Sequence, residues 1–236
     1  MKILGIDGSG LVASVAIVED DNLIGEYTTG YKKTHSQTLL PMLDELSKMV
    51  ELDLNTLDAI AVAAGPGSFT GLRIASATAK GLGLSLGCPI VSVPTVDALA
   101  FNLWGSETII CPIMDARRGQ VYTGLYQFGT DGQFKTIKPQ CAVDFTEIAD
   151  QINATGQPVT FLGDGVPVFK DKISELITVP YRFAPAHLNR QHASSVAALG
   201  KIYYENGDCE PAADHRPEYL RLSQAERERM EKEGKA

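Results

Sequence analysis

The chain has 236 residues, 44% of them hydrophobic, and a formal net charge of −8 at pH 7, which suits one large or two small globular domains. The acidic balance argues against a direct nucleic-acid binder, because binding to phosphates needs clustered lysine and arginine, and no apolar run approaches the roughly 18 residues that would span a bilayer. The four cysteines stand far apart without a Cys-x-x-Cys pair, so we expect a reduced, cytoplasmic protein.

The first part of the chain predicts a three-stranded meander followed by an amphipathic helix. Residues 3–7 form a short apolar run that ends on a carboxylate, and residues 13–19 and 23–29 follow as strands after short turns. Residues 35–50 then change to a helical period, with an apolar face formed by Leu39, Met42, Leu43, Leu46, Met49 and Val50. Pro41 fits this helix only if the helix begins a residue or two before it.

The stretch 59–83 combines a buried strand, a glycine turn and a helix. Residues 59–64 are continuously apolar, as in a strand covered on both faces, and Gly65-Pro66-Gly67 ends them. Ser68 and Thr70 both offer an N-cap oxygen to a helix over 70–86. A ridge of small residues recurs every four positions along it: Gly71, Ala75, Ala79 and Gly83. Such a ridge lets another backbone approach closely, so we expect this helix to be packed against, inside the fold or by a second chain.

The pattern then restarts, which predicts a duplicated unit. After a strand at 89–93 and a helix at 95–103, residues 109–115 form a strand that ends on Asp115, as the first strand ends on Asp7. Two further strands follow it, as in the first meander. In the remainder, Asp144 opens a predicted helix over 144–152, followed by a strand over 159–162 and a helix over 168–177. An irregular stretch is expected over 180–189, and Ser194 or Ser195 opens a last helix that ends at 204.

Strands in groups of three that alternate with helices predict an α/β protein with mixed sheets. Duplication of a strand-strand-strand-helix-strand-helix unit is the plan of the actin-like (ASKHA) superfamily of sugar kinases and Hsp70 ATPases. We expect an N-terminal subdomain over 1–106, a reduced C-terminal subdomain over 107–222, and a charged tail over 223–236.

Candidate chemistry at the strand ends is limited to two carboxylates and a hydroxyl. Asp7, Ser9 and Asp115 could hold Mg²⁺ and phosphate as in the superfamily, but Asp7 could also cap the N–H groups of its own turn, and we favour the latter. The glycine turn at 65–71 opens a helix, yet it lacks the spacing of a phosphate-binding loop, so we favour tight strand–helix packing for it. Gly163-Asp164-Gly165 is the only candidate for a second such loop.

Neither the histidines nor a nucleophile motif predicts a catalytic centre. His35, His187, His192 and His215 lack the spacing of zinc or iron ligands on one helix, and no Gly-x-Ser-x-Gly elbow is present. We expect His35 to make a hydrogen bond at the start of its helix. The sequence therefore predicts neither a cofactor nor a metal site.

The two helices of the first half are the other candidate for function. The apolar face of helix 35–50 and the small-residue ridge of helix 70–86 are typical of helices that pack in pairs and bundles. Apolar stripes usually face a core, so two interpretations stand: a core face, or a protein–protein interface made of both helices.

Several stretches resemble signature segments of the bacterial TsaB family. They are residues 3–7, 35–41, 65–74, 93–95, 114–122, 163–165 and 219–221. The block Gly65-Pro66-Gly67-Ser68-Phe69-Thr70-Gly71-Leu72-Arg73-Ile74 is the most specific, and the order is kept from Met1 to about Glu226. Gly8 departs from the family, which more often has threonine there, and this weakens a phosphate role for that turn.

The resemblance implies a subunit of the machinery that makes threonylcarbamoyladenosine (t6A) at position 37 of tRNA. In that family the paralogue TsaD holds a metal through paired histidines and transfers threonylcarbamoyl from its adenylate to tRNA. TsaB is the non-catalytic subunit that dimerises with TsaD, and the ATPase TsaE completes the complex. The region equivalent to the histidine pair, residues 94–99, has no histidine here.

The resemblance also implies that both helices dock TsaD in a four-helix arrangement, and form a homodimer when TsaD is absent, while tRNA is bound mainly through TsaD. The expected interface residues are His35, Leu39, Met42, Leu43, Leu46, Phe69, Thr70, Gly71, Arg73, Ile74, Ala75, Thr78 and Ala79. The alternative is an independent ATP-dependent kinase or hydrolase of the same superfamily that uses Asp7 and Asp115.

Overall fold

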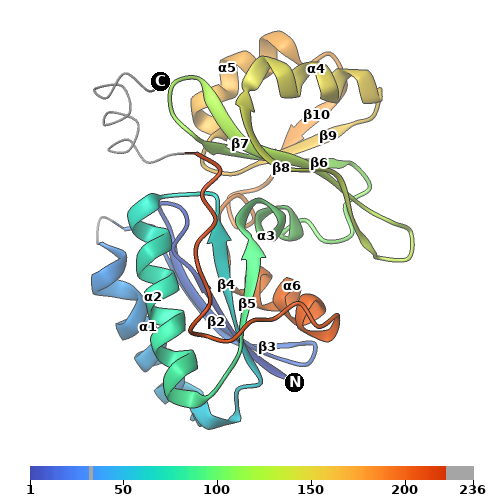
Figure 1. The fold of residues 1–236 in the computed structure, drawn as a ribbon. Helices are drawn as coiled ribbons and strands as arrows, with labels where there is room; N and C mark the ends of the chain where they lie inside the picture. The colour runs from blue at the N-terminus through green and yellow to red at the C-terminus, as the bar shows by residue number, and fades with distance from the viewer. Residues whose placement is uncertain (32–33, 222–236) are drawn as a thin grey trace.

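The computed structural model describes residues 1–31 and 34–221 and contains two five-stranded mixed sheets (Figure 1). The first sheet has the order β3 (Asn22–Thr29), β2 (Ala13–Glu19), β1 (Lys2–Asp7), β4 (Ala59–Gly65) and β5 (Ile90–Pro94). The second has the order β8 (Phe134–Asp144), β7 (Gln120–Phe128), β6 (Ile109–Asp115), β9 (Val159–Leu162) and β10 (Tyr181–Phe183). In both sheets the central strand pairs antiparallel with the next strand of the meander and parallel with the strand on its other side. The predicted duplication of an α/β unit is therefore confirmed.

Helices cover both faces of the first sheet, because its central strands are apolar on both sides. α1 (His35–Met49) and α2 (Phe69–Leu86) lie side by side against one face, and α6 (Ala193–Glu205) lies against the other. The period of two along β1 divides its side chains between the faces: Leu4 packs in the cluster under α1 and α2, and Ile3 packs in the cluster with α6.

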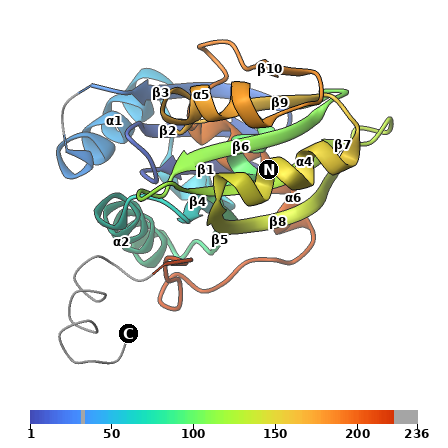
Figure 2. The same ribbon diagram turned by 90° about the horizontal axis from the view of Figure 1, so that it is seen from above.

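The second sheet is covered differently on its two faces. α4 (Phe145–Thr155) and α5 (Val166–Leu176) cover its outer face, as seen from above in Figure 2. The short helix α3 (Thr95–Phe101) lies between the two sheets, where Leu99 shares a buried cluster with Tyr126 of β7. This helix joins the halves through a common apolar core.

The division of the chain differs from the predicted one in its last part. We expected residues 107–222 to form the second subdomain, but α6 and the segment after it pack on the first sheet. The backbone N–H of Ile90 donates to the carbonyl of Glu210 at 2.9 Å, which pairs this segment with the edge strand β5. The stretch 180–189, expected to be irregular, contains β10, which pairs in parallel with β9. The predicted charged tail over 223–236 lies outside the described residues.

The helix starts also refine the predictions. α1 begins at His35, so Pro41 lies inside the helix and not near its start. Ser68, one of the two predicted caps, is the N-cap of α2, and its side chain accepts from the N–H of Gly71. Neither Ser194 nor Ser195 caps α6, because the N-cap position is His192 and both serines lie inside the helix. The Ser194 hydroxyl donates to Glu26 instead. No helix in the described part of the chain is long and apolar enough to cross a membrane.

Candidate functional site

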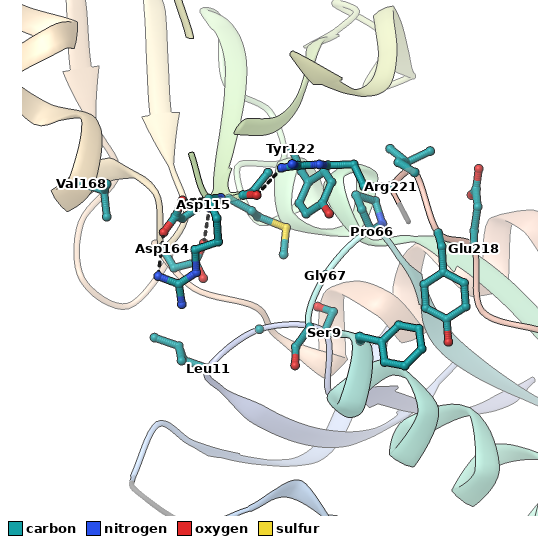
Figure 3. Close-up of a pocket in the computed structure, with 18 residues that line it drawn as sticks. Ser9, Leu11, Pro66, Gly67, Asp115, Tyr122, Asp164, Val168, Glu218 and Arg221 are labelled. Atoms are coloured by element: carbon teal, nitrogen blue, oxygen red, sulfur yellow. Dashed lines mark hydrogen bonds and ion pairs between the residues drawn. The ribbon is translucent and has the colours of Figure 1, made fainter. Parts of the chain in front are cut away.

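The first candidate site is a cleft of about 520 Å³ between the two halves of the molecule (Figure 3). The turn after β1 contributes Ser9 to it, the glycine turn after β4 contributes Gly67, and the end of β6 contributes Asp115. Asp164 and residues 218–221 also line it. The cleft thus lies where the superfamily plan places a ligand, at the ends of the central strands.

Asp7, the first predicted site residue, does not line this cleft but is buried beneath it. Its side chain accepts from the N–H of Ser9 at 2.8 Å and from the Ser9 hydroxyl at 2.6 Å. Burial raises the pKa of Asp7 to about 6, and the hydrogen bonds from Ser9 and the nearby His35 and His192 limit the rise. Asp7 caps its own turn in this structure, as the favoured interpretation of the sequence states.

Asp115, the equivalent residue of the second half, does reach the cleft. One of its carboxylate oxygens accepts from the N–H of Arg117 at 2.8 Å, and the other pairs with the Arg117 guanidinium at 3.2 Å. Asp164 lies beside it, 3.4 Å from the Asp115 N–H, and burial raises the pKa of Asp164 while that hydrogen bond and Arg190 lower it. Within residues 1–31 and 34–221, no group of three or more metal-ligating side chains comes together.

The glycine turn packs against the turn after β1. The N–H of Ser68 donates to the carbonyl of Ser9 at 2.7 Å, and a Cβ atom added at Gly67 would overlap that carbonyl. Likewise, a Cβ atom at Gly71 would overlap the carbonyl oxygen of Gly8. The close approach predicted for the small-residue ridge is therefore made at Gly71 within the chain, and two N–H groups at the start of α2, those of Ser68 and Gly71, already have partners.

The extended segment 218–221 crosses the mouth of the cleft, a role that the sequence did not predict. The N–H of Glu218 donates to the carbonyl of Ala64 at 2.7 Å, and the Tyr219 ring lies 4.9 Å from the ring of Phe69. Arg221 donates from Nη1 to the carbonyl of Ala116, in the other half. The only signal in the sequence was the family resemblance of residues 219–221, which did not indicate where this segment lies in the fold.

The second candidate site is the pair α1 and α2, and six of the residues predicted at its interface are buried within the chain itself. They are the buried residues Leu39, Leu43, Leu46, Gly71, Ala75 and Ala79. All of them except Gly71 belong to the core cluster between these helices and the first sheet. Their side chains face the sheet because the apolar stripe and the small-residue ridge are the inward faces of the two helices.

The outward surface of α1 and α2 is composed of other residues. Thr70 and Arg73 are exposed there, and the predicted residues His35, Met42, Phe69, Ile74 and Thr78 are half-buried. Three large apolar side chains are also exposed on these helices: Leu40 (54%), Met49 (67%) and Leu84 (63%). Within the described ranges no other helix or strand covers this outer surface (Figure 1).

His35, at the start of α1, connects the two candidate sites. Its Nε2 atom lies 2.9 Å from the carbonyl oxygen of Gly10, in the turn after β1. The prediction that His35 makes a hydrogen bond at its helix start is confirmed. The contact fixes the beginning of α1 to the turn that lines the cleft.

Comparison with known proteins gives one consistent family. The sequence model of the TsaD family, described as tRNA N6-adenosine threonylcarbamoyltransferase, matches residues 22–229. A relative from Bacillus subtilis (strain 168), tRNA threonylcarbamoyladenosine biosynthesis protein TsaB, is 36% identical over 228 residues, which is 96% of each chain. YeaZ from Pseudomonas aeruginosa has a similar structure, with a TM-score of 0.79, 27% identity, and coverage of 93% of this chain and 99% of that chain.

A more distant structure shares the fold alone. The ethanolamine utilization protein EutJ from Carboxydothermus hydrogenoformans is 13% identical, with a TM-score of 0.50 over 85% of this chain and 90% of that chain. The predicted duplicated actin-like fold is confirmed.

Proposed function

The chain belongs to the TsaB family, and from this we propose that it is the non-catalytic subunit of a tRNA N6-adenosine threonylcarbamoyltransferase complex. In this proposal it pairs with the catalytic paralogue TsaD and supports transfer of threonylcarbamoyl from threonylcarbamoyl-adenylate to adenosine 37 of tRNA. The state of the cleft agrees with a supporting role, because the carboxylates Asp7 and Asp115 are both engaged by groups of their own turns.

The observation that carries the proposal is the uncovered outer surface of α1 and α2. Leu40 and Leu84 are more than half exposed on it, and large apolar side chains in such a position mark protein–protein contact sites. Two adjacent helices present a surface into which a matching pair can pack as a four-helix arrangement. The contact residues are then the exposed and half-buried ones, among them Thr70, Ile74 and Thr78.

The proposal extends to the assembly and its place in the cell. The same surface would allow self-association when TsaD is absent, because an isologous contact needs only one self-complementary surface. The ATPase TsaE would join the heterodimer in a larger complex, and most tRNA contacts would come from TsaD. We place this assembly in the cytoplasm, and it requires no cofactor bound to this chain.

Reconstitution with the cognate TsaD tests this function. We expect the two chains to elute together from a size-exclusion column, and t6A to form on tRNA only when both are present with TsaE and threonylcarbamoyl-adenylate. This chain without TsaD should leave the tRNA unmodified. If TsaD elutes separately from this chain and modifies tRNA equally well without it, the proposed function is wrong.

A further inference from the structure

A groove of about 490 Å³ runs between α2 and the segment that follows α6. In Figure 1 this segment, drawn in red, runs beside α2 on its way to the cleft. Lys80 of α2 fixes the two together, since its Nζ atom donates to the carbonyls of Ala213 at 2.8 Å and His215 at 2.9 Å. Arg73 of α2 and Arg216 of the segment also line the groove.

The positive charges of this groove are not neutralised by ion pairs. Lys80 bonds to backbone carbonyls, while Arg73 donates from Nε to the Tyr219 hydroxyl at 3.3 Å and lies over the Phe69 ring at 4.1 Å. Among residues 1–31 and 34–221, no carboxylate comes within ion-pair distance of Arg73, Lys80 or Arg216, and none lines the groove. Three cations therefore share one groove in a chain whose net charge is −8.

His215 forms part of the groove and contacts the carboxylate of Glu210, which does not itself line the groove. Its Nδ1 atom lies 3.0 Å from Glu210 and 2.9 Å from the Ser92 hydroxyl, which itself donates to Glu210 at 2.7 Å. Burial alone would raise the pKa of Glu210, but these two hydrogen bonds and the charges of His215 and Lys80 lower it. His215 is 1% exposed, and within the described chain its Nε2 atom has no hydrogen-bond partner.

The spacing and the surroundings of the cations favour an extended anion. Arg73 and Lys80 are two helical turns apart on α2, roughly 10 Å, which is more than a single phosphate or carboxylate group spans. Guanidinium groups match phosphate oxygens with paired donors. Tyr219, 40% exposed at the Arg73 end, offers an aromatic ring of the kind on which unpaired bases stack.

We propose that this groove binds the phosphate backbone of the tRNA substrate. The inference rests on the proposed function, because only that function makes tRNA the expected nucleic acid. It also changes the expectation that an acidic chain does not contact nucleic acid, since such a chain can do so where its cations are gathered without ion-pair partners. RNA is favoured over an acidic partner protein because the groove joins separated cations with an exposed aromatic ring. The contacts are with phosphate, so they position the tRNA without reading its sequence.

The test measures binding of a labelled tRNA transcript to the purified complex of this chain with its cognate TsaD, at several salt concentrations. The variant replaces Arg73 and Arg216 by glutamine. The matched control replaces Arg182 and Lys170, two exposed residues of the second half, by glutamine, so that the same charge is lost elsewhere. We expect the groove variant to weaken binding about 10-fold near 0.1 M salt and to reduce the slope of log Kd against log salt by about 1 to 2. The control should stay within about twofold of the wild type.

A single charge reversal, Arg216→Glu, keeps the test independent of folding, because the Arg216 side chain is exposed and has no hydrogen bond within the described ranges. It should also weaken tRNA binding, with an unchanged thermal midpoint. Equal losses in the groove variant and the control, or no loss in either, would overturn the proposal.

Affinity for TsaD is measured in parallel with the same variants. Lost TsaD binding with unchanged tRNA binding would assign the groove to a protein contact and overturn the proposal as well. The proposed function fails separately, when the wild-type chain itself does not bind TsaD.

Discussion

The cleft between the two halves and the outer surface of α1 and α2 differ in how their side chains are satisfied. Asp7, buried beneath the cleft, is engaged by Ser9, and Asp115, which lines the cleft, is engaged by Arg117. On the outer surface, Leu40 and Leu84 are left largely exposed. A carboxylate at a position where an enzyme superfamily carries its catalytic groups is therefore weak evidence for chemistry when groups of its own turn already bind it. Groups that the chain leaves without a partner are the better indication of where another molecule binds.

The largest expected effect comes from closing the approach between α2 and the cleft turn. In Gly71→Ala the new Cβ atom would overlap the carbonyl oxygen of Gly8, a backbone atom that cannot move without disturbing β1 and α2. We expect the free energy of unfolding to fall by about 3 kcal/mol, as for severe overpacking of a core. Urea denaturation monitored by circular dichroism measures it.

The same helix supplies the control. Gly81→Ala places a Cβ atom where nothing lies within 4 Å, and replacing a helical glycine by alanine should raise the free energy of unfolding by about 0.5 to 1 kcal/mol. Similar destabilisation by both substitutions would show that Gly71 does not pack closely against the carbonyl oxygen of Gly8.

The next largest effect is the loss of folding stability caused by burying the ionised carboxylate of Asp7. Because burial raises the pKa of Asp7 to about 6, the folded state holds more protons than the unfolded state between about pH 4 and pH 6. The free energy of unfolding therefore falls as pH rises through this window. Asp7→Asn keeps an oxygen that can accept from Ser9 and removes the charge, so at pH 7.5 it should stabilise the chain by about 2 kcal/mol.

Urea denaturation at pH 4 and at pH 7.5 checks this expectation. The gain from Asp7→Asn should be present at pH 7.5 and close to zero at pH 4, where Asp7 is protonated in the folded state. Asp150→Asn, at an exposed position on α4, should change neither value by more than about 0.5 kcal/mol. A destabilised Asp7→Asn at pH 7.5 would mean that the ionised carboxylate is wanted in the cleft.

The smallest expected effect is that of a nucleotide on the cleft. With Asp7 buried and Asp115 paired to Arg117, we expect titration of ATP–Mg²⁺ into the chain to give no heat beyond dilution in a calorimeter. Binding that is lost in Asp115→Asn would instead favour an independent kinase or hydrolase. That result would make the cleft, and not the outer surface of α1 and α2, the functional site.

The sequence predicted the elements well because their signals are local. The predicted strands at 13–19, 109–115 and 159–162 coincide with β2, β6 and β9, since a short apolar run between turn residues is a strong local signal for a strand. The strand β10 was missed because it is a three-residue strand at the sheet edge that pairs only with β9. The docking of α6 on the first sheet depends on contacts between distant residues, which periodicity does not encode.

The candidate site was predicted less well, for a reason that Ala75 and Leu40 make clear. A ridge of small residues predicts that a backbone comes close, but its spacing is the same whether the neighbour is the chain itself or another molecule. Ala75 and Ala79 turned out to face the core. Leu40 was passed over because it lies outside the apolar stripe, yet an apolar residue outside the stripe was the available signal for an outward contact.

The affinity of TsaD for a chain whose outer surface of α1 and α2 carries added charge tests directly whether TsaD binds there. The variant Leu40→Asp with Leu84→Asp is compared with Leu23→Asp and Ile202→Asp, which charge two exposed apolar positions elsewhere, 53% and 40% exposed. We expect the first pair to weaken TsaD binding at least about 10-fold, or about 1.4 kcal/mol, while both pairs unfold at similar urea concentrations and the second binds as the wild type does. Equal affinity for TsaD in both double variants would mean that TsaD does not bind the outer surface of α1 and α2.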